Sequence, residues 1–435
     1  MRVIGLGLLG LGNVGAGVVK LLADNAAAIE ARLGARVEVR RIAVQQAEKR
    51  RLVEVDKKLV TTRARDVIDD PSVDVVIELI GGTEPAREYV LGAIAKGKHV
   101  VTANKALLAY HGDELLAACA ENNVEIYYEA SVGGGIPLIR ALREGLASDR
   151  IDEVIGIVNG TSNFILTQMT EQGRDFNEVL AEAQKAGYAE ADPTLDVGGG
   201  DAAHKLAVLA ALCFGTKIDF TKVFFEGIDK LTQRDFAYAE RFGYTIKLLA
   251  IGKDHGDSIE LRVHPTMVPK RWLLASVGGV FNAVYVNSQA LGQSMYYGRG
   301  AGMMPTAVAV VSDVIEIART LLAGAPGTRA SVPRAKRPER RIRDIGELES
   351  RYYLRFGVED RPGVLAQLAG ILGDHDISIA EVVQEGRRDP QRPASVVIVT
   401  HRARESNVQA ALAAIGKLPA ASEPTQLVRI YETRP

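Results

Sequence analysis

Residues 3–22 read VIGLGLLGLGNVGAGVVKLL, and this stretch decides the fold of the first part of the chain. It holds two overlapping GxGxxG frames, one over residues 5–10 and one over residues 10–15. The second frame follows a complete apolar run and leads into apolar residues at helical spacing from Val14 to Leu22. A strand, a glycine-rich turn and a helix start form the context of a phosphate-binding turn. The second frame is therefore the predicted turn.

Each glycine of this frame has a physical role. Gly10 permits the tight turn, Gly12 lets the backbone approach a pyrophosphate, and Gly15 lets the helix pack closely on the strand. The helix N-terminus then faces the anion. Gly5 and Gly7 are expected to belong to the strand and to touch no cofactor. The alternative is a glycine-rich turn that binds nothing.

Apolar runs and helical periods alternate onward from this turn to about residue 130. Strands are predicted at 3–9, 37–44, 73–80, 99–103 and 124–129, and helices at 14–33, 84–95 and 112–121. This alternation predicts an α/β domain over residues 1–130, a doubly wound parallel Rossmann sheet. Residues 131–325 mix helix and strand signals with glycine clusters at 133–135, 198–200 and 298–302. They predict an α+β domain, to which the family resemblance described below assigns substrate binding and dimerisation.

The last part of the chain begins with a basic stretch. Residues 328–343 contain seven basic residues, two prolines and one acid, so residues 326–349 are predicted to form a solvated linker. Binding of an anionic surface is the alternative. Residues 350–435 show strands at 351–359, 377–385, 395–401 and 426–432, with helices at 364–372 and 405–418. The order β-α-β-β-α-β predicts a ferredoxin-like domain.

Composition excludes several classes of function. The 435 residues include 53 basic and 54 acidic ones, and the net charge of −1 gives no reason to expect a nucleic-acid or membrane partner. The apolar run at 206–214 is too short to span a bilayer. No signal peptide is expected, because the apolar start at residues 1–11 carries three glycines and lacks a cleavage site. The two cysteines show no metal or disulfide pattern, which favours a reducing, cytoplasmic location.

The residues after the second predicted strand bear on cofactor choice. A site that prefers NAD has an acidic residue there, which binds the ribose 2′-hydroxyl. This chain has Gln45 and Gln46 instead, with Arg40 and other basic residues around them. A missing acid among basic residues suits a 2′-phosphate, so we predict a preference for NADP(H) over NAD(H), with Arg40 as the first candidate contact. Exposed helix charges are the alternative explanation.

A polar cluster marks the middle of the chain. Residues 187–205 read GYAEADPTLDVGGGDAAHK, with the carboxylates of Glu190, Asp192, Asp196 and Asp201 close together in sequence. Asp201 and Lys205 are four residues apart at the start of an apolar helix, so they share one face. The cluster predicts a pocket for an amino group and a reacting oxygen, and a surface salt bridge is the alternative.

Lys105 follows the predicted strand at 99–103. The carboxyl ends of parallel strands face the ligand crevice, so this lysine could point at a nicotinamide and a substrate.

Several of these motifs together resemble homoserine dehydrogenase over nearly the whole chain. The run from Gly187 through Lys205 is similar to that family's signature, and VTANK at 101–105, YEASVGGGIP at 128–137 and NGTSNFIL at 159–166 agree with it. The resemblance implies NAD(P)H-dependent interconversion of L-aspartate 4-semialdehyde and L-homoserine, on the way to threonine, methionine and isoleucine. Because the chain starts at the first Rossmann strand, the kinase of bifunctional relatives is expected to be absent.

The resemblance also implies roles for single residues. Lys205 matches the family's proton donor and acceptor, with Lys105 as a second lysine at the reacting centre and Asp201 beside them. The residues that match substrate contacts are Glu190, Asp201, Asp196, Gly160 and Thr161. Those that match cofactor contacts, besides Gly10, Gly12, Gly15, Arg40 and Lys105, are Asn13, Val14, Gly187 and Gly302. The family often has threonine at the position of Asn13, a departure that leaves backbone contacts possible.

A monovalent cation, sodium in the family, is implied at the turn that begins at residue 129. Its ligands would be Glu129 and the backbone oxygens of Val132, Gly134 and Ile136.

The C-terminal unit is similar to an ACT domain, with DRPGVL at 360–365 between its first strand and helix. ACT domains commonly bind amino acids, so threonine feedback is one hypothesis and assembly alone is the other. A homodimer or homotetramer is expected. The rival functions are another small amino-aldehyde or hydroxy-acid dehydrogenase and a catalytically inactive ACT-type amino-acid sensor.

Overall fold

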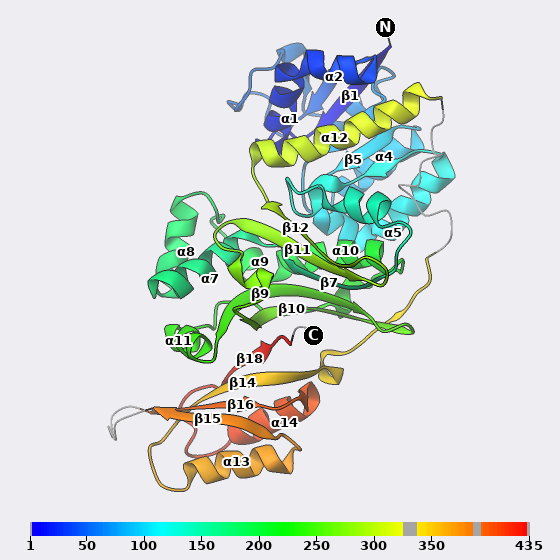
Figure 1. Ribbon diagram of the computed structural model, residues 1–435. Coiled ribbons are helices and arrows are strands. Elements are labelled where there is room, and N and C mark those ends of the chain that lie inside the picture. The colour runs from blue at the N-terminus through cyan, green and yellow to red at the C-terminus, as the bar shows by residue number, and fades with distance from the viewer. Residues whose placement is uncertain (1, 325–336, 386–392, 433–435) are drawn as a thin grey trace.

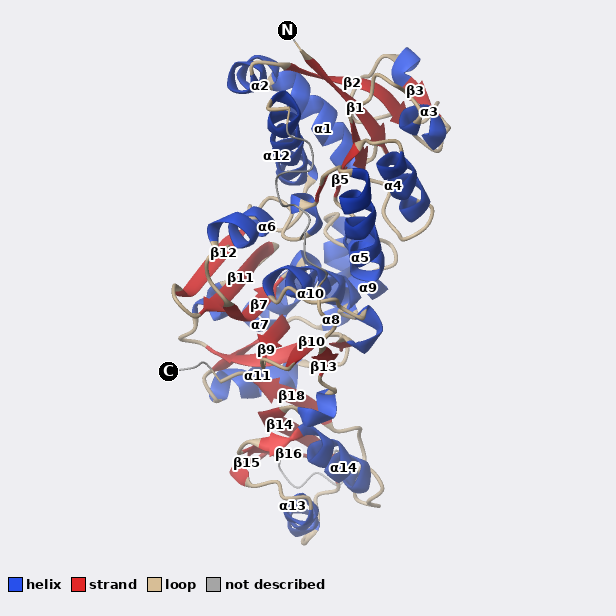
Figure 2. Ribbon diagram, turned by 90° about the vertical axis from the view of Figure 1, so that its right-hand side faces the viewer, coloured by secondary structure: helices blue, strands red, loops and turns tan. Residues whose placement is uncertain are grey.

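A computed structural model describes residues 2–324, 337–385 and 393–432 of the chain. Three domains follow one another along the long axis of the molecule, and the two views agree on this order (Figures 1 and 2). The N-terminal domain lies at one end, the central domain in the middle and the C-terminal domain at the other end. None of the described helices is both long and apolar enough to cross a membrane.

The N-terminal domain is a six-stranded sheet, and every neighbouring pair in it is parallel. The strand order is β3-β2-β1-β4-β5-β6, which confirms the predicted doubly wound architecture. Its strands are β1 (Val3–Leu9), β2 (Arg36–Ala43), β3 (Val60–Thr61), β4 (Val75–Glu78), β5 (His99–Thr102) and β6 (Ile126–Tyr127). Its helices are α1 (Asn13–Asp24), α2 (Ala26–Leu33), α3 (Ala64–Ile68), α4 (Ala86–Ala95) and α5 (Lys105–Asn122).

Two helices of this domain differ from the prediction. The helix predicted at 14–33 is divided at Asn25, whose backbone leaves the helical region with φ −111° and ψ 15°. Helix α5 begins at Lys105 rather than at residue 112, because the side chain of Asn104 accepts a hydrogen bond from the Leu107 amide and caps the helix. The cap places Lys105 in the first helical turn.

Helix α12 (Met303–Leu322) returns from the central domain to the N-terminal sheet (yellow in Figure 1). Its buried residues Ala307, Val310 and Val314 share one core cluster with Leu6 and Val18. The sequence prediction assigns these residues to the domain at 131–325. Hydrophobic periodicity identifies the helix but does not say which core its apolar face covers.

The central domain is built on antiparallel strands of a mixed sheet, with helices packed on it. Its main strands are β7 (Ile151–Ile157), β9 (Tyr244–Asp254), β10 (Ser258–Pro269), β11 (Phe281–Ser288) and β12 (Gly292–Arg299). Its helices are α6 (Leu138–Arg140), α7 (Gly160–Gln172), α8 (Phe176–Lys185), α9 (Thr194–Val197), α10 (Gly200–Cys213) and α11 (Gln233–Arg241), and a short strand β8 (Phe224–Phe225) pairs with β10. This mixture confirms the predicted α+β character.

The C-terminal domain has the predicted order of elements. They are β14 (Glu349–Val358), α13 (Val364–Asp374), β15 (Ile379–Glu385), β16 (Ala394–Thr400), α14 (Glu405–Ile415) and β18 (Gln426–Ile430), with a short β17 (Ala403–Arg404) paired to β14. The sheet order β18-β14-β16-β15 is that of a ferredoxin-like unit. Strand β18 also pairs with β10 at Thr266–Arg429 and Met267–Ile430, so one sheet continues from the central domain into the C-terminal domain.

The basic stretch before the C-terminal domain differs from the predicted solvated linker where it is described. Strand β13 (Arg341–Ile342) pairs with β10, and the Arg340 guanidinium lies 2.8 Å from Asp254. This part of the stretch is therefore tied to the central sheet by charge pairs. Residues 325–336 of the predicted linker lie outside the described residues.

Candidate active site and cofactor pocket

A cavity of about 400 Å³ opens over the glycine-rich turn of the N-terminal domain. Gly10, Leu11 and Gly12 line it, and α1 begins directly after Gly12. Gly10 has a φ of 108°, and a Cβ atom there would lie 2.9 Å from the Leu79 carbonyl oxygen. A Cβ atom at Gly12 would meet no atom within 4 Å, so its outer side is open to a ligand. The turn has the geometry that a pyrophosphate needs at a helix N-terminus.

The third glycine of the frame serves packing. A Cβ atom at Gly15 would lie 2.5 Å from the Gly10 carbonyl oxygen, so a larger residue would push the helix away from the turn. Asn13 is exposed and Val14 half-buried at the start of α1, and neither of these two predicted cofactor contacts is among the residues that line the cavity.

Arg40, the first candidate for a 2′-phosphate contact, is not among the residues that line this cavity. It lies in the middle of β2, where its side chain packs over Gly5 and its guanidinium pairs with Glu38 at 3.0 Å. The basic residues that line the cavity are Lys49 and Arg51. Arg51 donates hydrogen bonds to the carbonyl oxygens of Leu11 and Gln46, so it bridges the turn and the end of the second strand. The geometry therefore favours Lys49 and Arg51 over Arg40 as contacts to a 2′-phosphate.

Three charged side chains from two domains meet beyond this cavity. Lys105, in the first turn of α5, lies 3.1 Å from one Asp201 oxygen. Lys205 lies 2.6 Å from the other Asp201 oxygen, and its ammonium also donates to the Val158 carbonyl at 2.7 Å. The Asp201 side chain is 6% exposed, whereas that of Lys105 is 35% exposed. We call these three residues the Lys–Asp–Lys triad.

Mutual attraction keeps Asp201 and Lys105 charged. Burial alone would raise the pKa of Asp201, but Lys205 and Lys105 hold it well below its usual range. Burial alone would lower the pKa of Lys105, because it disfavours the charged ammonium form. The adjacent Asp201 more than reverses this effect, so the pKa of Lys105 is raised. The site therefore presents a carboxylate between ammonium groups, and the more exposed of these ammonium groups faces solvent.

Asn159 links the triad to a second carboxylate. Its side-chain amide donates to Asp201 at 2.8 Å and to Asp196 at 2.7 Å, while its side-chain oxygen caps α7 by accepting from the Ser162 amide. Burial raises the pKa of Asp196, and Asn159 opposes this rise. The sequence motif at 159–166 drew attention to Gly160 and Thr161 but not to Asn159. Asn159 follows the buried strand β7 by two residues, and this position was the feature of the sequence that could have pointed to it.

The remaining predicted substrate residues lie around the triad. Gly160 and Thr161 follow Asn159, and the Thr161 hydroxyl donates to the Tyr188 carbonyl at 2.6 Å. That contact ties α7 to the turn at residues 187–193, which carries Glu190 and begins at Gly187 with a φ of 75°. Glu190 is exposed and contributes to the raised pKa of Lys105. The structure brings the predicted residues of this region into one neighbourhood.

Glu78 is a functional residue that sequence reasoning missed. It ends β4, is fully buried, and accepts hydrogen bonds from the Thr102 hydroxyl at 2.6 Å and the Ile80 amide at 2.7 Å. Thr102 ends β5, and Asn104 two residues later caps the helix that carries Lys105. Glu78 therefore holds the β5–α5 junction and positions Lys105. A single acid at a strand end carries no local sequence signal for this role.

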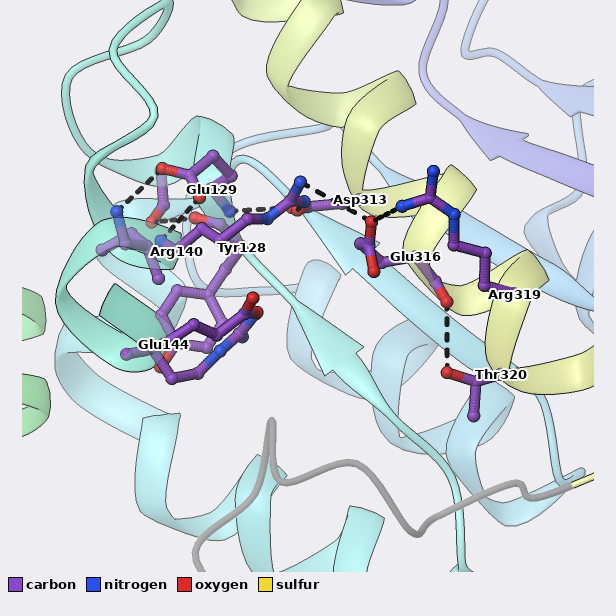
Figure 3. Close-up of polar contacts among 11 residues, drawn as sticks. Tyr128, Glu129, Arg140, Glu144, Asp313, Glu316, Arg319 and Thr320 are labelled. Carbon is purple, nitrogen blue, oxygen red and sulfur yellow. Dashed lines mark hydrogen bonds and ion pairs between the residues drawn. The ribbon is translucent and has the colours of Figure 1, made fainter. Parts of the chain in front are cut away.

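The predicted cation loop lies where the central domain meets α12 (Figure 3). Both carboxylate oxygens of Glu129 accept backbone amides at 2.8 Å, from Ile139 and Arg140, so this side chain caps α6. The Glu129 amide donates to Asp313 at 2.8 Å, and Arg140 lies 3.2 Å from the same carboxylate. Burial, followed by the charge of Glu129, raises the pKa of Asp313 to about 7.

Backbone oxygens in this loop are the better candidates for cation ligands. Within the described residues, the carbonyl oxygens of Val132 and Gly134 accept no hydrogen bond, whereas that of Ile136 accepts from the Leu138 amide at 2.7 Å. Nowhere among the described residues do three or more histidine, cysteine or acidic side chains form a group that could hold a metal. A Cβ atom at Gly134 would lie 2.4 Å from the Gly300 carbonyl oxygen, so the loop packs against the turn that carries Gly302.

Comparisons with known proteins agree with this geometry. Residues 10–129 match the family description "Homoserine dehydrogenase, NAD binding domain", residues 137–315 match "Homoserine dehydrogenase", and residues 352–420 match "ACT domain". A homoserine dehydrogenase of Neisseria gonorrhoeae is 46% identical, with 99% of both chains covered. One of Pseudomonas aeruginosa is also 46% identical, with 99% of this chain and 100% of the relative covered. The solved structure of a homoserine dehydrogenase from Thiobacillus denitrificans superposes with a TM-score of 0.92 at 46% identity, with 99% of each chain covered.

The role of Glu78 gives a prediction about stability. Glu78→Gln replaces one acceptor by an amide group that faces the Thr102 hydroxyl or the Ile80 amide, and leaves a buried donor unmatched. Such a loss costs about 1–3 kcal/mol of unfolding free energy. The measurement is denaturant unfolding of both proteins. Glu54→Gln, at an exposed position, is the matched control and should be neutral. Equal stability of the two variants would contradict the role of Glu78.

Proposed function

Because the chain belongs to the homoserine dehydrogenase family, we propose that it interconverts L-aspartate 4-semialdehyde and L-homoserine with a nicotinamide cofactor. This chemistry serves the formation of threonine, methionine and isoleucine. The observation that carries the proposal is the Lys–Asp–Lys triad, which sets two ammonium groups around one buried carboxylate beside a dinucleotide cavity. An inactive sensor would not need to keep this costly buried charge arrangement.

The cofactor, when bound over the turn at Gly10–Gly15, supplies or accepts the hydride. The chain's own residues supply proton transfer and charge stabilisation at the substrate oxygen. Reduction of the aldehyde makes a developing alkoxide, and the Lys205 ammonium donates its proton to that oxygen. Lys105 places a second positive charge at the same centre. A positioned acid and fixed charges in a partly closed site are how such a barrier is lowered.

The substrate's α-ammonium group needs anionic partners. Glu190 and Asp196 supply them, while Asp201 is committed to the two lysines at 3.1 and 2.6 Å. Gly160 and Thr161 line the substrate, and Gly187 and Gly302 let backbone approach the nicotinamide end of the cofactor.

We propose a preference for NADP(H) over NAD(H), now through Lys49 and Arg51. Both line the cavity beside Gln45 and Gln46, where no acid stands to bind a free ribose hydroxyl. Arginine offers a planar fork of donors that suits a phosphate.

We also propose that a sodium ion binds at the loop of Val132 and Gly134. The chain is further proposed to assemble as a homodimer or homotetramer. The ACT domain would bind an amino-acid effector such as threonine. The ion would tie the loop that contacts the turn of Gly302.

The first test measures homoserine-dependent reduction of NADP⁺ and NAD⁺. Lys205→Ala should lower kcat by about 10²–10⁴-fold, the contribution of a positioned general acid or base, with a smaller change in KM. Lys222→Ala is the matched control, because Lys222 pairs with Asp219 on the surface at 3.3 Å and should not matter. Near-normal kcat in Lys205→Ala would remove Lys205 from the role of proton donor.

A second test addresses cofactor choice. Arg51→Ala should raise KM for NADPH about 10–100-fold, because one charge-assisted hydrogen bond is worth about 1.5–3 kcal/mol, and leave KM for NADH nearly unchanged. Arg40→Ala should change neither the KM for NADPH nor the KM for NADH, since the Arg40 guanidinium pairs with Glu38. Steady-state kinetics with both cofactors decide this. A large effect of Arg40→Ala on NADPH alone would restore Arg40 and exclude Arg51.

A further inference from the structure

Asn282 has a buried amide side chain that the proposed function does not use. It is the second residue of β11, and the alternation of side chains along a strand puts it on the same face as Val284 and Val286. Those two valines share a core cluster with Leu206 of α10, so α10 covers this face of the sheet. The Asn282 side chain therefore lies on the side of the sheet where the Lys–Asp–Lys triad is found.

Neither polar atom of the Asn282 side chain has a hydrogen-bond partner among the described residues, although Asn282 is only 1% exposed. A buried amide without partners costs free energy, and an apolar side chain of similar size would avoid this cost. Stability therefore does not account for an amide at this position. Native proteins accept such a cost at functional sites, where a ligand can supply the missing partners.

Two glycines place the Asn282 amide next to the proposed substrate site. A Cβ atom at Gly300 would overlap the Cγ and Nδ2 atoms of Asn282, so the amide plane lies against the Gly300 backbone. A Cβ atom at Gly160 would lie 3.7 Å from the Oδ1 atom of Asn282. Gly160 starts α7 directly after Asn159, whose side chain donates to Asp201 at 2.8 Å. The Asn282 amide therefore lies beside the first residue of the helix whose N-cap holds Asp201.

The other side of the Asn282 amide leads toward the cofactor. Gly300 belongs to the turn at residues 299–302, which connects β12 to α12 (Figure 1). Met303 starts α12, and its carbonyl oxygen lies 2.7 Å from the place of a Cβ atom at Gly17 of α1. Because α1 begins at the glycine-rich turn, residues 299–302 lie between that helix and Asn282. A dinucleotide over the glycine-rich turn, with its nicotinamide directed to the triad, would lie next to them.

The chemistry of the two unpartnered atoms selects the ligand group. Nδ2 donates and Oδ1 accepts, so the matching group has one acceptor and one donor side by side. The carboxamide of a nicotinamide has a carbonyl oxygen and an amide nitrogen in this arrangement, whereas a carboxylate has only acceptors and would leave Oδ1 unmatched. Residues 300–302 are Gly-Ala-Gly, so a backbone displacement of this turn exposes the Asn282 amide with no large side chain in the way.

We propose that Asn282 is a further cofactor-binding residue, whose side-chain amide pairs with the nicotinamide carboxamide through two hydrogen bonds. This pairing fixes the orientation of the nicotinamide ring relative to the substrate at the triad, and correct orientation of reacting groups accelerates their reaction. The inference rests on the proposed dehydrogenase function, because a nicotinamide must be bound, but it concerns binding and not turnover.

Calorimetric titration without homoserine compares NADP⁺ with its 3-acetylpyridine analogue, in which a methyl group replaces the carboxamide nitrogen. The unchanged protein should bind the analogue at least about fivefold more weakly, because the Oδ1 atom of Asn282 loses its donor. In Asn282→Leu the two dinucleotides should bind with affinities within about twofold of each other, since no group reads the carboxamide nitrogen. Thermal unfolding checks that the variant folds, and Asn282→Ala takes its place if it does not.

Asn287→Leu is the matched control on β11. An odd number of residues separates Asn287 from Asn282, so the two side chains lie on opposite faces of the sheet, and this variant should keep the discrimination. Equal binding of both dinucleotides by the unchanged protein overturns the proposal. Full discrimination in Asn282→Leu also overturns it, even if both dinucleotides bind more weakly by the same factor, because a purely structural role predicts that result.

Failure of the proposed function would look different. If NAD⁺ binds more tightly than NADP⁺, the same comparison is made with NAD⁺ and its 3-acetylpyridine analogue. A protein that binds neither NADP⁺ nor NAD⁺ would contradict the dehydrogenase function, whereas unaltered discrimination in Asn282→Leu would contradict only the role of Asn282.

Discussion

The buried carboxylate of Asp201 is the constraint on which the rest of the structure depends. Burying a charge is costly unless partners are held in place, and removing one partner of such a group typically costs several kcal/mol. Lys205 comes from the same helix, whereas Lys105 comes from the N-terminal domain. The ion pairs that keep Asp201 charged therefore also join two domains, at the place where we propose that cofactor and substrate meet. The same ion pairs thus stabilise the domain arrangement and hold the lysines that we propose to act on the substrate.

Supporting residues hold this interaction from both sides. Glu78 and Asn104 fix the start of α5 on the N-terminal side, and Asn159 fixes Asp201 on the central side. Each acts through a backbone cap or a buried hydrogen bond, which leaves little freedom to the side chain it positions. Helix α10 also packs on the central sheet, which continues into the C-terminal domain through the pairing of β10 and β18.

The local part of this arrangement could be predicted from the sequence, and the long-range part could not. The turn at Gly10–Gly15, the order of the strands along the chain and the shared face of Asp201 and Lys205 follow from periodicity and spacing. Arg40 was chosen from its spacing, which does not show that its side chain packs over Gly5 and pairs with Glu38. Glu78, Asn159 and the return of α12 to the N-terminal core depend on contacts between distant residues, which a single sequence does not display.

A crystal structure with NADPH and L-homoserine would show whether the Lys–Asp–Lys triad holds the reacting oxygen, because the reduced cofactor and the alcohol cannot react and the complex is stable. We expect the homoserine hydroxyl within hydrogen-bond distance of Lys205 or Lys105, with Asp201 still between the two lysines, and the α-ammonium group next to Glu190 and Asp196. A homoserine hydroxyl bound away from both lysines, or an Asp201 turned out of the triad to hold the α-ammonium group, would rule out the proposed role of the triad.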